Sequence, residues 1–396
     1  MTYVQTRTFH ESNIWLEKKP LLSQIDIELT ERCNNNCIHC CINLPESDAE
    51  ALSCEMSTDF VKGVLTQAAA LGCLAVRFTG GEPLLRDDLI ELYRFTRHLG
   101  MQVILFTNAR LITTELAELL SKLPPGRVVE VSVYGMRPDT YDRVAGHEGA
   151  FSEFRRGVDL LLRHKVPFIV KGPKFHFQEG EQEAFEAWAS TIPSMNTMPV
   201  SSMNFDLRHR RDDPAKNARI TRLRATPEET VAAHSRNPRY LKDMVQFCGR
   251  FMGPPGDRLF TCGAGHGTCV DAYGRAQLCL SLRNAETVVD LHKATLKHAL
   301  EESFPAIRKI RAANPDYLRR CARCFLKGLC QQCPAKSWLE HGSLDTPVEY
   351  LCLVAHAEAR YLGLLGEREH AWEVEGWQAR VVGFVKARGA TLQPET

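Results

Sequence analysis

One stretch near the N-terminus decides the fold: residues 30–40, TERCNNNCIHC, in which three cysteines follow the spacing C-x3-C-x2-C. Three thiolates so close together in a polar loop suit a single metal centre. Iron–sulfur clusters are held by cysteine thiolates, and three protein ligands leave one iron of a four-iron cluster open to another molecule. Two alternatives stay open on these residues alone: a zinc site with His39 as fourth ligand, and three unrelated buried thiols.

The stretch comes directly after the first of six predicted strands. Between residue 23 and about residue 207, short β-branched and apolar runs alternate with helical patterns, which is typical of βα units around a parallel sheet. Six such units predict an α/β fold with a partial (β/α)6 TIM-like barrel, because the two further units of a complete barrel do not follow. The strands are predicted at residues 23–29, 73–79, 102–107, 128–133, 166–171 and 198–207.

The second predicted strand runs into Gly80-Gly81-Glu82-Pro83. Glycines there permit close backbone approach, and the glutamate places a carboxylate at the mouth of the strand. In this order the cysteine loop and GGEP resemble the radical S-adenosylmethionine (SAM) superfamily. The resemblance implies that Cys33, Cys37 and Cys40 ligate a [4Fe–4S] cluster, that SAM chelates its open iron, and that residues 80–83 contact the SAM amine.

Other strand ends carry polar residues at positions where the superfamily contacts the ribose or the carboxylate of SAM. By resemblance these are Thr107, Asn108, Ser132 and Lys171, although polar residues at strand ends also serve as caps. His39 stands where the family often has an aromatic residue that meets the adenine, and an imidazole can stack there.

Composition excludes several classes of protein. The 49 lysines and arginines balance 48 aspartates and glutamates, so no overall field attracts nucleic acid or an anionic membrane. The chain shows neither a secretory signal nor an apolar stretch of membrane-spanning length. Fifteen cysteines without an export signal therefore predict a cytoplasmic, metal-binding protein rather than a disulfide framework.

A second group of cysteines follows in the C-terminal half, and eight thiols there suffice for two four-ligand sites. Their spacing resembles the SPASM extension of radical SAM enzymes, with two residues rather than three between the last pair of the central motif. Structural zinc remains an alternative for both sites. By resemblance, one auxiliary [4Fe–4S] cluster uses Cys262, Cys269, Cys279 and Cys333, and the other Cys321, Cys324, Cys330 and Cys352.

Changes in composition and residue pattern along the chain predict five segments. Thr226-Pro227-Glu228-Glu229 predicts a helix start with a capping box, and the basic segment 208–224 is interpreted as a solvated loop and helix face, or alternatively as a grip for an acidic leader peptide. The segments are an N-terminal extension (1–22), a radical SAM barrel (23–224), a helical linker (225–261), a SPASM domain (262–355) and a helical tail (356–396).

The resemblance implies reductive cleavage of SAM to a 5′-deoxyadenosyl radical, with the auxiliary clusters accepting the electron left on the product. SPASM relatives mostly modify peptides, so we expect oxidative maturation of a peptide or protein (a RiPP-type precursor) by a thioether or carbon–carbon crosslink or a side-chain oxidation. Leu280 after Cys279 stands where sulfatase-maturing relatives place an aspartate, which disfavours formylglycine formation.

The expected partners are a peptide substrate, a separate leader-recognition protein, because few residues precede the first strand, and a flavodoxin- or ferredoxin-type electron donor. Nucleic acid and membrane are not expected as partners. The alternatives are a radical SAM oxidoreductase for a sugar, aminocyclitol or tetrapyrrole intermediate, and a non-catalytic metal-binding or electron-transfer protein.

Overall fold

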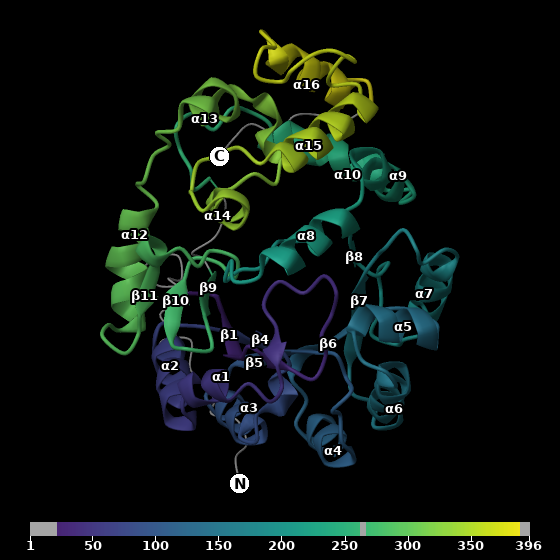
Figure 1. The fold of residues 1–396 in the computed structure, drawn as a ribbon, viewed down its shortest axis with the longest axis vertical. Helices are drawn as coiled ribbons and strands as arrows, with labels where there is room; N and C mark the ends of the chain where they lie inside the picture. Colours follow the sequence, from purple (N-terminus) through teal and green to yellow (C-terminus); the bar gives the residue numbers. More distant parts are fainter. Residues whose placement is uncertain (1–21, 262–266, 389–396) are drawn as a thin grey trace. The chain divides into compact units, whose positions relative to one another are not determined.

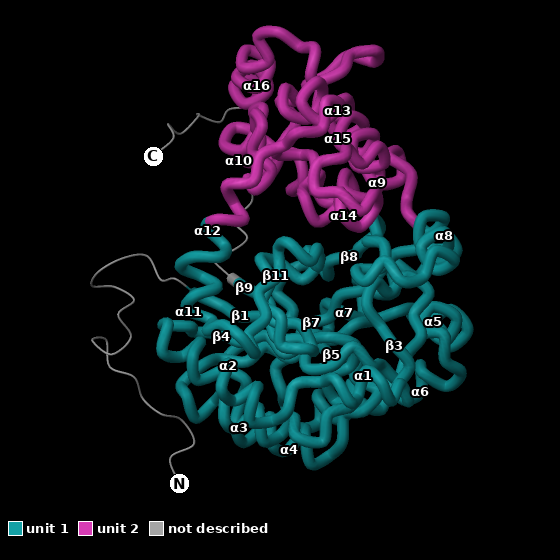
Figure 2. Tube along the Cα trace, turned by 60° about the vertical axis from the view of Figure 1, so that its left-hand side comes forward, with its two compact units in different colours: residues 1–223, 263–305 teal, residues 224–262, 306–396 magenta. Residues whose placement is uncertain are grey.

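The computed structural model describes residues 22–261 and 267–388. The chain divides into two compact units, coloured separately in Figure 2. Unit 1 comprises residues 1–223 and 263–305, and unit 2 comprises residues 224–262 and 306–396. Residues 1–21 of the predicted N-terminal extension and Cys262 lie outside the described residues.

Unit 1 is built on a nine-stranded sheet whose order is β11-β10-β9-β1-β4-β5-β6-β7-β8 (Figure 1). Each neighbouring pair from β1 to β8 is parallel and follows the chain order, as repeated βα units require. The predicted α/β class with a parallel-dominated sheet is confirmed, and the described sheet is open, with β8 and β11 at its edges. The parallel strands are β1 (Gln24–Thr30), β4 (Ala75–Gly80), β5 (Gln102–Thr107), β6 (Gly126–Ser132), β7 (Phe168–Pro173) and β8 (Ser201–Ser202).

Helices connect these strands, and their ends carry the expected punctuation. Ser57 caps α2 by accepting a hydrogen bond from the Phe60 amide, and Gly72 follows the helix with a φ of 83°. The helices of this part are α1 (Ala49–Cys54), α2 (Thr58–Ala70), α3 (Leu89–His98), α4 (Thr114–Lys122), α5 (Pro138–Ala145), α6 (Ala150–Arg163), α7 (Glu181–Ala189) and α8 (Pro214–Leu223).

The sheet continues beyond β1 through β9 (Gly267–Val270), β10 (Arg275–Gln277) and β11 (Val288–Asp290). Strand β9 pairs with β1 in parallel, with Cys269 opposite Asp26. The predicted boundaries assigned residues 267–290 to the cysteine-rich domain, whereas their backbone hydrogen bonds extend the sheet of unit 1. This pairing satisfies the edge of β1, which would otherwise present unpaired backbone groups. Two short elements, α11 (Leu296–His298) and α12 (Phe304–Ile307), follow.

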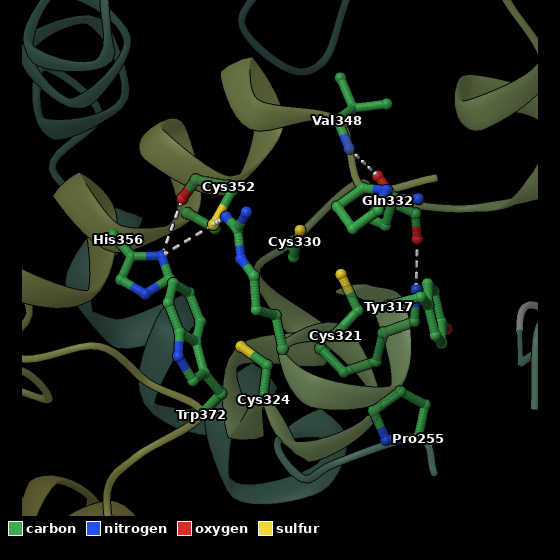
Figure 3. A pocket seen from close by; sticks show the side chains of 14 residues that line it. Pro255, Tyr317, Cys321, Cys324, Cys330, Gln332, Val348, Cys352, His356 and Trp372 are labelled. Carbon is green, nitrogen blue, oxygen red and sulfur yellow. Dashed lines mark hydrogen bonds between the residues drawn. The ribbon is translucent and has the colours of Figure 1, made fainter. Parts of the chain in front are cut away.

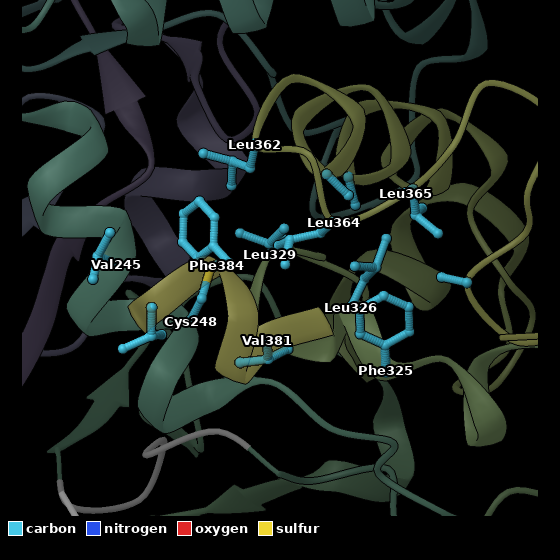
Figure 4. Packing of buried hydrophobic residues seen from close by; sticks show 14 of the residues in the cluster. Val245, Cys248, Phe325, Leu326, Leu329, Leu362, Leu364, Leu365, Val381 and Phe384 are labelled. Atoms are coloured by element: carbon cyan, nitrogen blue, oxygen red, sulfur yellow. The ribbon is translucent and has the colours of Figure 1, made fainter. Parts of the chain in front are cut away.

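Unit 2 is helical, and its core is shown in Figure 4. Thr226 and Glu229 form the predicted capping box of α9, with Pro227 in the first turn. Phe325, Leu326 and Cys248 are buried in the apolar cluster. The helices are α9 (Pro227–Ser235), α10 (Tyr240–Phe251), α13 (Pro315–Arg319), α14 (Pro334–His341), α15 (Glu349–Tyr361) and α16 (Trp377–Lys386). Helix α15 runs across the boundary predicted between residues 355 and 356. In the described part of the chain, no helix combines the length and apolarity needed to cross a bilayer.

Candidate metal and cofactor sites

The cysteine loop lies between the end of β1 and α1. Two short strands, β2 (Arg32–Cys33) and β3 (Leu44–Pro45), pair in parallel at its base. The Asn36 amide donates to the carbonyl of Ala145 at 2.8 Å. A Cβ atom at Gly146 would lie 2.3 Å from the Asn36 carbonyl oxygen, so only glycine permits this approach. The loop is therefore fixed against the end of α5.

The three thiols of this loop lie near one another. Burial raises the pKa of Cys33, and the neighbouring Cys37, Glu82 and Cys40 raise it further. Burial also raises the pKa of Cys37 to about 12, with Cys40 adding to the rise. Without a metal these two thiols are therefore protonated at neutral pH, and a metal centre that binds them must displace their protons.

Several nitrogen atoms around the loop suit a sulfur-rich group. The Asn35 amide donates to the Cys33 sulfur at 3.4 Å. Among the described residues, the buried atoms Asn34 Nδ2 and His39 Nδ1 have no hydrogen-bond partner, whereas the Asn35 side chain bonds to the Cys37 thiol. Buried polar groups are nearly always bonded, and N–H donors to sulfur are a regular feature of iron–sulfur sites. The donor set of the loop thus fits an iron–sulfur cluster.

The Gly80-Gly81 pair brings the end of β4 against the start of this loop. A Cβ atom at either glycine would lie 2.1 Å from a backbone carbonyl oxygen, that of Thr30 for Gly80 and that of Arg32 for Gly81. Gly80 also has a φ of 126°, which side chains rarely adopt. The Gly81 amide donates to the Thr30 carbonyl at 2.7 Å. Both glycines are therefore required by the backbone approach that the sequence predicted.

Glu82 is fully buried and joins the ends of β4 and β5. Its carboxylate accepts hydrogen bonds from Thr107 Oγ1 and from the Asn108 amide, both at 2.8 Å. Burial raises the pKa of Glu82 to about 7, although these hydrogen bonds oppose the rise. Pro83 begins the short 3-10 turn η1 (Pro83–Leu85) that follows. The hydroxyl of Thr107 therefore donates to Glu82 in this structure.

The Asn108 side chain turns toward the cysteine loop. Its Nδ2 donates to Asn34 Oδ1 at 2.8 Å and lies 3.9 Å from the Cys33 sulfur. The predicted cofactor residues 80–83, Thr107 and Asn108 are therefore gathered with the cysteine triad in one place.

His39 lies among aromatic rings contributed by later strand ends. Its ring centroid is 5.1 Å from Phe205, 5.4 Å from Phe175 and 5.9 Å from Tyr134. Burial lowers the pKa of His39 to about 3, so the imidazole is neutral. The sequence did not reveal these three aromatic partners, because nothing local marks side chains that meet only in the folded sheet.

Ser132 and Lys171 face each other across β6 and β7. The Lys171 ammonium lies 2.6 Å from Glu130 Oε2 and 3.4 Å from the centre of the Phe106 ring. Burial lowers the pKa of Lys171, and the bond to Glu130 opposes this. Lys171 is therefore engaged on the face of the sheet, a pairing that the sequence did not predict.

The basic segment 208–224 is not wholly solvated. Arg208, His209 and Lys216 are only 3–5% exposed, so the solvated interpretation is wrong for them. Lys216 Nζ donates to Asn43 Oδ1 at 2.7 Å, and Arg208 donates to the Asn43 carbonyl at 3.0 Å. These cations are buried because acceptors of the cysteine loop satisfy them.

A buried ionic cluster ties β1 to the segment after β10. Arg283 pairs with Glu28 at 2.6 Å and with Glu31, which also receives hydrogen bonds from Arg210 and Tyr273. Burial raises the pKa of Glu28 to about 7. For Glu31 the effect of burial is outweighed by Arg283 and Arg210, and its pKa is lowered. The cluster leaves these charges paired.

Two of the cysteines predicted for the first auxiliary site belong to unit 1. Cys269 is buried on β9, and burial, Asp26 and the neighbouring Cys279 raise its pKa. Cys333 belongs to unit 2. The four-cysteine set with Cys262 and Cys333 therefore stays a prediction.

The second auxiliary set, by contrast, lines one cavity of unit 2 (Figure 3). Cys321 and Cys324 flank the turn η4 (Cys321–Arg323), Cys330 follows η5 (Phe325–Gly328), and Cys352 lies in α15. Cys333 is not among the lining residues. Burial raises the pKa of each of the four thiols, to about 12 for Cys321 and Cys324 and about 11 for Cys352.

As the side chains lie, no group of three or more His, Cys, Asp or Glu residues in the described ranges is gathered closely enough to hold a metal ion. The four cysteines of unit 2 instead line a cavity. Its empty volume is about 490 Å³, and part of this volume is open to solvent. A thiol set around a space of this kind fits a multi-atom cluster in its ligand chemistry.

Comparison with known proteins matches one part of the chain, which includes the triad and GGEP, to a known family. Residues 27–184 match the family model of the radical SAM superfamily. Residues 27–184 therefore form a radical SAM domain. A radical SAM domain implies a [4Fe–4S] cluster and SAM, and the fit of the cysteine loop agrees with this implication.

Curated relatives match about this same part of the chain. An AdoMet-dependent heme synthase of Methanosarcina barkeri is 35% identical over 143 residues, which is 36% of this chain and 40% of the relative. A PqqA peptide cyclase of Bradyrhizobium diazoefficiens is 38% identical over 163 residues, 37% of this chain and 41% of the relative. The chain thus spans about 40% of the length of the curated relatives that it matches.

Solved structures resemble a larger part of the chain. Native anSMEcpe with bound AdoMet aligns with a TM-score of 0.60 at 15% identity, covering 92% of this chain and 99% of that one. Streptococcus suis SuiB bound to S-adenosylmethionine aligns with a TM-score of 0.61 at 16% identity, covering 84% and 77%. At these identities the likeness shows the fold.

Proposed function

We propose that this chain is a radical SAM enzyme that oxidatively modifies a peptide or protein, and that Cys33, Cys37 and Cys40 hold the cluster that cleaves SAM. One observation carries the proposal: the triad, the Gly80-Gly81 approach and the buried Glu82 meet at neighbouring strand ends, with unpartnered N–H donors around the thiols.

Each of these residues has a distinct task in the proposal. The two glycines bring backbone polar groups close to the cofactor, and Glu82 fixes Thr107 and Asn108 in place. His39 and its aromatic neighbours provide an apolar wall for the adenine. When bound, the cluster and SAM supply a carbon radical that removes a hydrogen atom from the substrate. The protein holds that substrate in position and excludes water.

Two further sets of thiols are proposed as auxiliary [4Fe–4S] sites. Cys262, Cys269, Cys279 and Cys333 form the first, and Cys321, Cys324, Cys330 and Cys352 the second. The shared cavity of the second set supports this grouping, because the intervening Cys333 is not part of its lining. Four protein thiolates leave no open iron, so the role proposed for these clusters is electron transfer.

The peptide substrate is inferred from two likenesses. One relative is named a PqqA peptide cyclase, and a structure of anSMEcpe with bound AdoMet and Cp18Cys peptide aligns over 92% of this chain with a TM-score of 0.54. A separate leader-recognition protein, a flavodoxin- or ferredoxin-type electron donor and a cytoplasmic location complete the proposal.

The test is SAM cleavage by anaerobically reconstituted protein with dithionite as reductant. Wild type should release 5′-deoxyadenosine, and the Cys33→Ala, Cys37→Ala, Cys40→Ala triple variant should release none. Iron should fall from about twelve to about eight atoms per chain in the triple variant. Cys54→Ala is the matched control, because Cys54 is exposed and outside all three sets. Wild-type protein that binds no iron or releases no 5′-deoxyadenosine would leave the non-catalytic alternative.

A second candidate is oxidation of a tetrapyrrole, which the heme synthase relatives favour. Incubation with iron-coproporphyrin III distinguishes the two functions, because a peptide-modifying enzyme should leave that compound unchanged. A precursor peptide encoded beside the gene, and a change in its mass on incubation with the protein, would support peptide modification.

A further inference from the structure

Side-chain donors in the unit 2 cavity converge on one sulfur. Arg320 Nη2 and His356 Nδ1 each lie 3.6 Å from Cys352 Sγ. Figure 3 shows His356 beside Cys352, at the wall of the cavity that the four cysteines line. Cys324 and Cys330, by contrast, receive backbone amides, from Leu326 and Gln332. The sulfur of Cys352 is therefore the one whose donors can be changed by substitution without altering the backbone.

The surroundings of His356 assign its proton. The Ala371 amide donates to His356 Nε2 at 3.2 Å, so Nε2 is an acceptor and the proton sits on Nδ1. Nδ1 donates to the Cys352 carbonyl at 2.8 Å and also faces the sulfur. Because Nε2 accepts a hydrogen bond and carries no proton, the ring is a neutral donor.

Arg320 is held in place from several sides. Its guanidinium lies 4.8 Å from the centre of the Trp372 ring and 2.7 Å from Glu349 Oε2. Its Nε is buried and has no partner among the described residues. A buried N–H without an acceptor beside four thiols is expected where a further sulfur-containing group is bound. Glu349 is 61% exposed, so solvent screens its charge more than that of Arg320, which is 17% exposed.

The contacts of Arg320 and His356 with Cys352 bear on the reduction potential of a bound cluster, because the cluster is negatively charged. Four thiolates around a [4Fe–4S] cluster in its two-plus state carry a net charge of about minus two, and one-electron reduction makes it about minus three. A fixed cation and an N–H donor at a ligand sulfur stabilise the more negative, reduced state, which raises the reduction potential. Lys327 also lines the cavity, where it donates to the Gln332 carbonyl and lies near enough to Cys321 and Cys330 to favour their thiolate forms.

We infer that Arg320 and His356 are positioning residues that raise the reduction potential of a cluster held by Cys321, Cys324, Cys330 and Cys352. This inference rests on the proposed function, in which that cluster accepts an electron. Arg320 supplies charge and hydrogen bonding, and His356 hydrogen bonding alone. The effect of Arg320 is therefore the larger.

The test is an anaerobic redox titration followed by electron paramagnetic resonance. It uses full-length protein in which Cys33, Cys37, Cys40, Cys269 and Cys279 are replaced by alanine, so that the unit 2 cluster gives the signal. Arg320→Met should weaken the reduced state about tenfold, which lowers the midpoint potential by about 59 mV. His356→Leu should lower it by less, and Arg320→Lys should restore part of the loss. Arg319→Met is the matched control, because Arg319 is 74% exposed on the adjacent position.

The outcomes separate the inference from the proposed function. Variants that keep their iron and sulfide but leave the potential unchanged overturn the inference while the cluster stands. A parent protein that takes up zinc, or no metal, in this cavity overturns the inference together with the auxiliary cluster proposed there, and leaves SAM cleavage by the triad to its own test. If the five-cysteine background fails to fold, the same titration of otherwise wild-type protein carrying Arg320→Met should shift one signal and leave the others, and a result with no shifted signal overturns the inference.

Discussion

The cysteine loop of unit 1 and the four-cysteine cavity of unit 2 differ in the number of their thiols and in the groups around them. The loop offers three thiols beside a glycine-rich strand end, and some of its buried side-chain nitrogen atoms have no hydrogen-bond partner among the described residues. The cavity offers four thiols on its wall, with side-chain donors directed at one sulfur. Three ligands leave a coordination position for chemistry, whereas four close the cluster and leave its potential as the adjustable property.

The two regions also differ in how they are fixed. The loop depends on long-range contacts, with the carbonyl and side chain of Asn43 accepting from Arg208 and Lys216 far along the chain. The cavity is assembled from residues 317–372 and Pro255, most of which are close in sequence. The reactive region should therefore be the more sensitive to single substitutions away from the cysteines.

The largest effect is expected from Gly81→Ala. The new Cβ atom would lie 2.1 Å from the Arg32 carbonyl oxygen, so the end of β4 and the cysteine loop must separate. A misplacement of about 1 Å costs about 100-fold in rate, and SAM cleavage measured as 5′-deoxyadenosine should fall by at least that factor. Gly63→Ala is the control, because its Cβ atom meets nothing within 4 Å in the middle of α2. Equal activity of the two variants would contradict the importance given to this approach.

The next effect concerns Lys216. Lys216→Met leaves the buried side-chain oxygen of Asn43 with only the longer 3.4 Å contact from Arg208 in place of its 2.7 Å donor, which should cost about 1 kcal/mol. The urea midpoint of the protein and the iron retained after desalting should both fall. Lys216→Arg should recover part of the loss. Arg222→Met, on the exposed side of the same helix, should change neither quantity, and a similar loss there would point to general charge removal instead.

Gly81 and Lys216 illustrate which features the sequence could predict and which it could not. The strands, the triad and GGEP were predictable because each depends on local pattern and spacing. The pairing of β9 with β1 and the burial of Lys216 were not, because both depend on partners more than 170 residues away. The cavity grouping came from a family resemblance rather than from spacing, since Cys333 is as close in sequence to Cys330 as Cys324 is to Cys321.

A smaller effect is expected in the pH dependence of stability, through Glu28. The pKa of this buried carboxyl is about 7 in the folded protein, above that of an exposed glutamate. Between those two values the folded protein binds more protons than the unfolded chain, so the free energy of unfolding falls as pH rises, by at most about 4 kcal/mol. Glu28→Gln should flatten this slope in urea unfolding at pH 5 and pH 8, whereas Glu115→Gln, exposed in α4, should keep it. A slope that Glu28→Gln leaves intact would assign the dependence to another group.

The smallest effect on SAM cleavage is expected from Cys324→Ala, which tests the comparison most directly. The substitution removes one ligand of the cavity and should lower the iron content by about four atoms per chain. Uncoupled release of 5′-deoxyadenosine should stay within about threefold of wild type, because the proposed function assigns the open iron to the loop of unit 1, where dithionite can reduce the cluster directly. Turnover of the substrate should fall much further, since the electron left on the product then lacks its acceptor. If Cys324→Ala abolishes uncoupled cleavage as Cys33→Ala does, the division between a reactive loop and an electron-transferring cavity fails, and the two regions act as one centre.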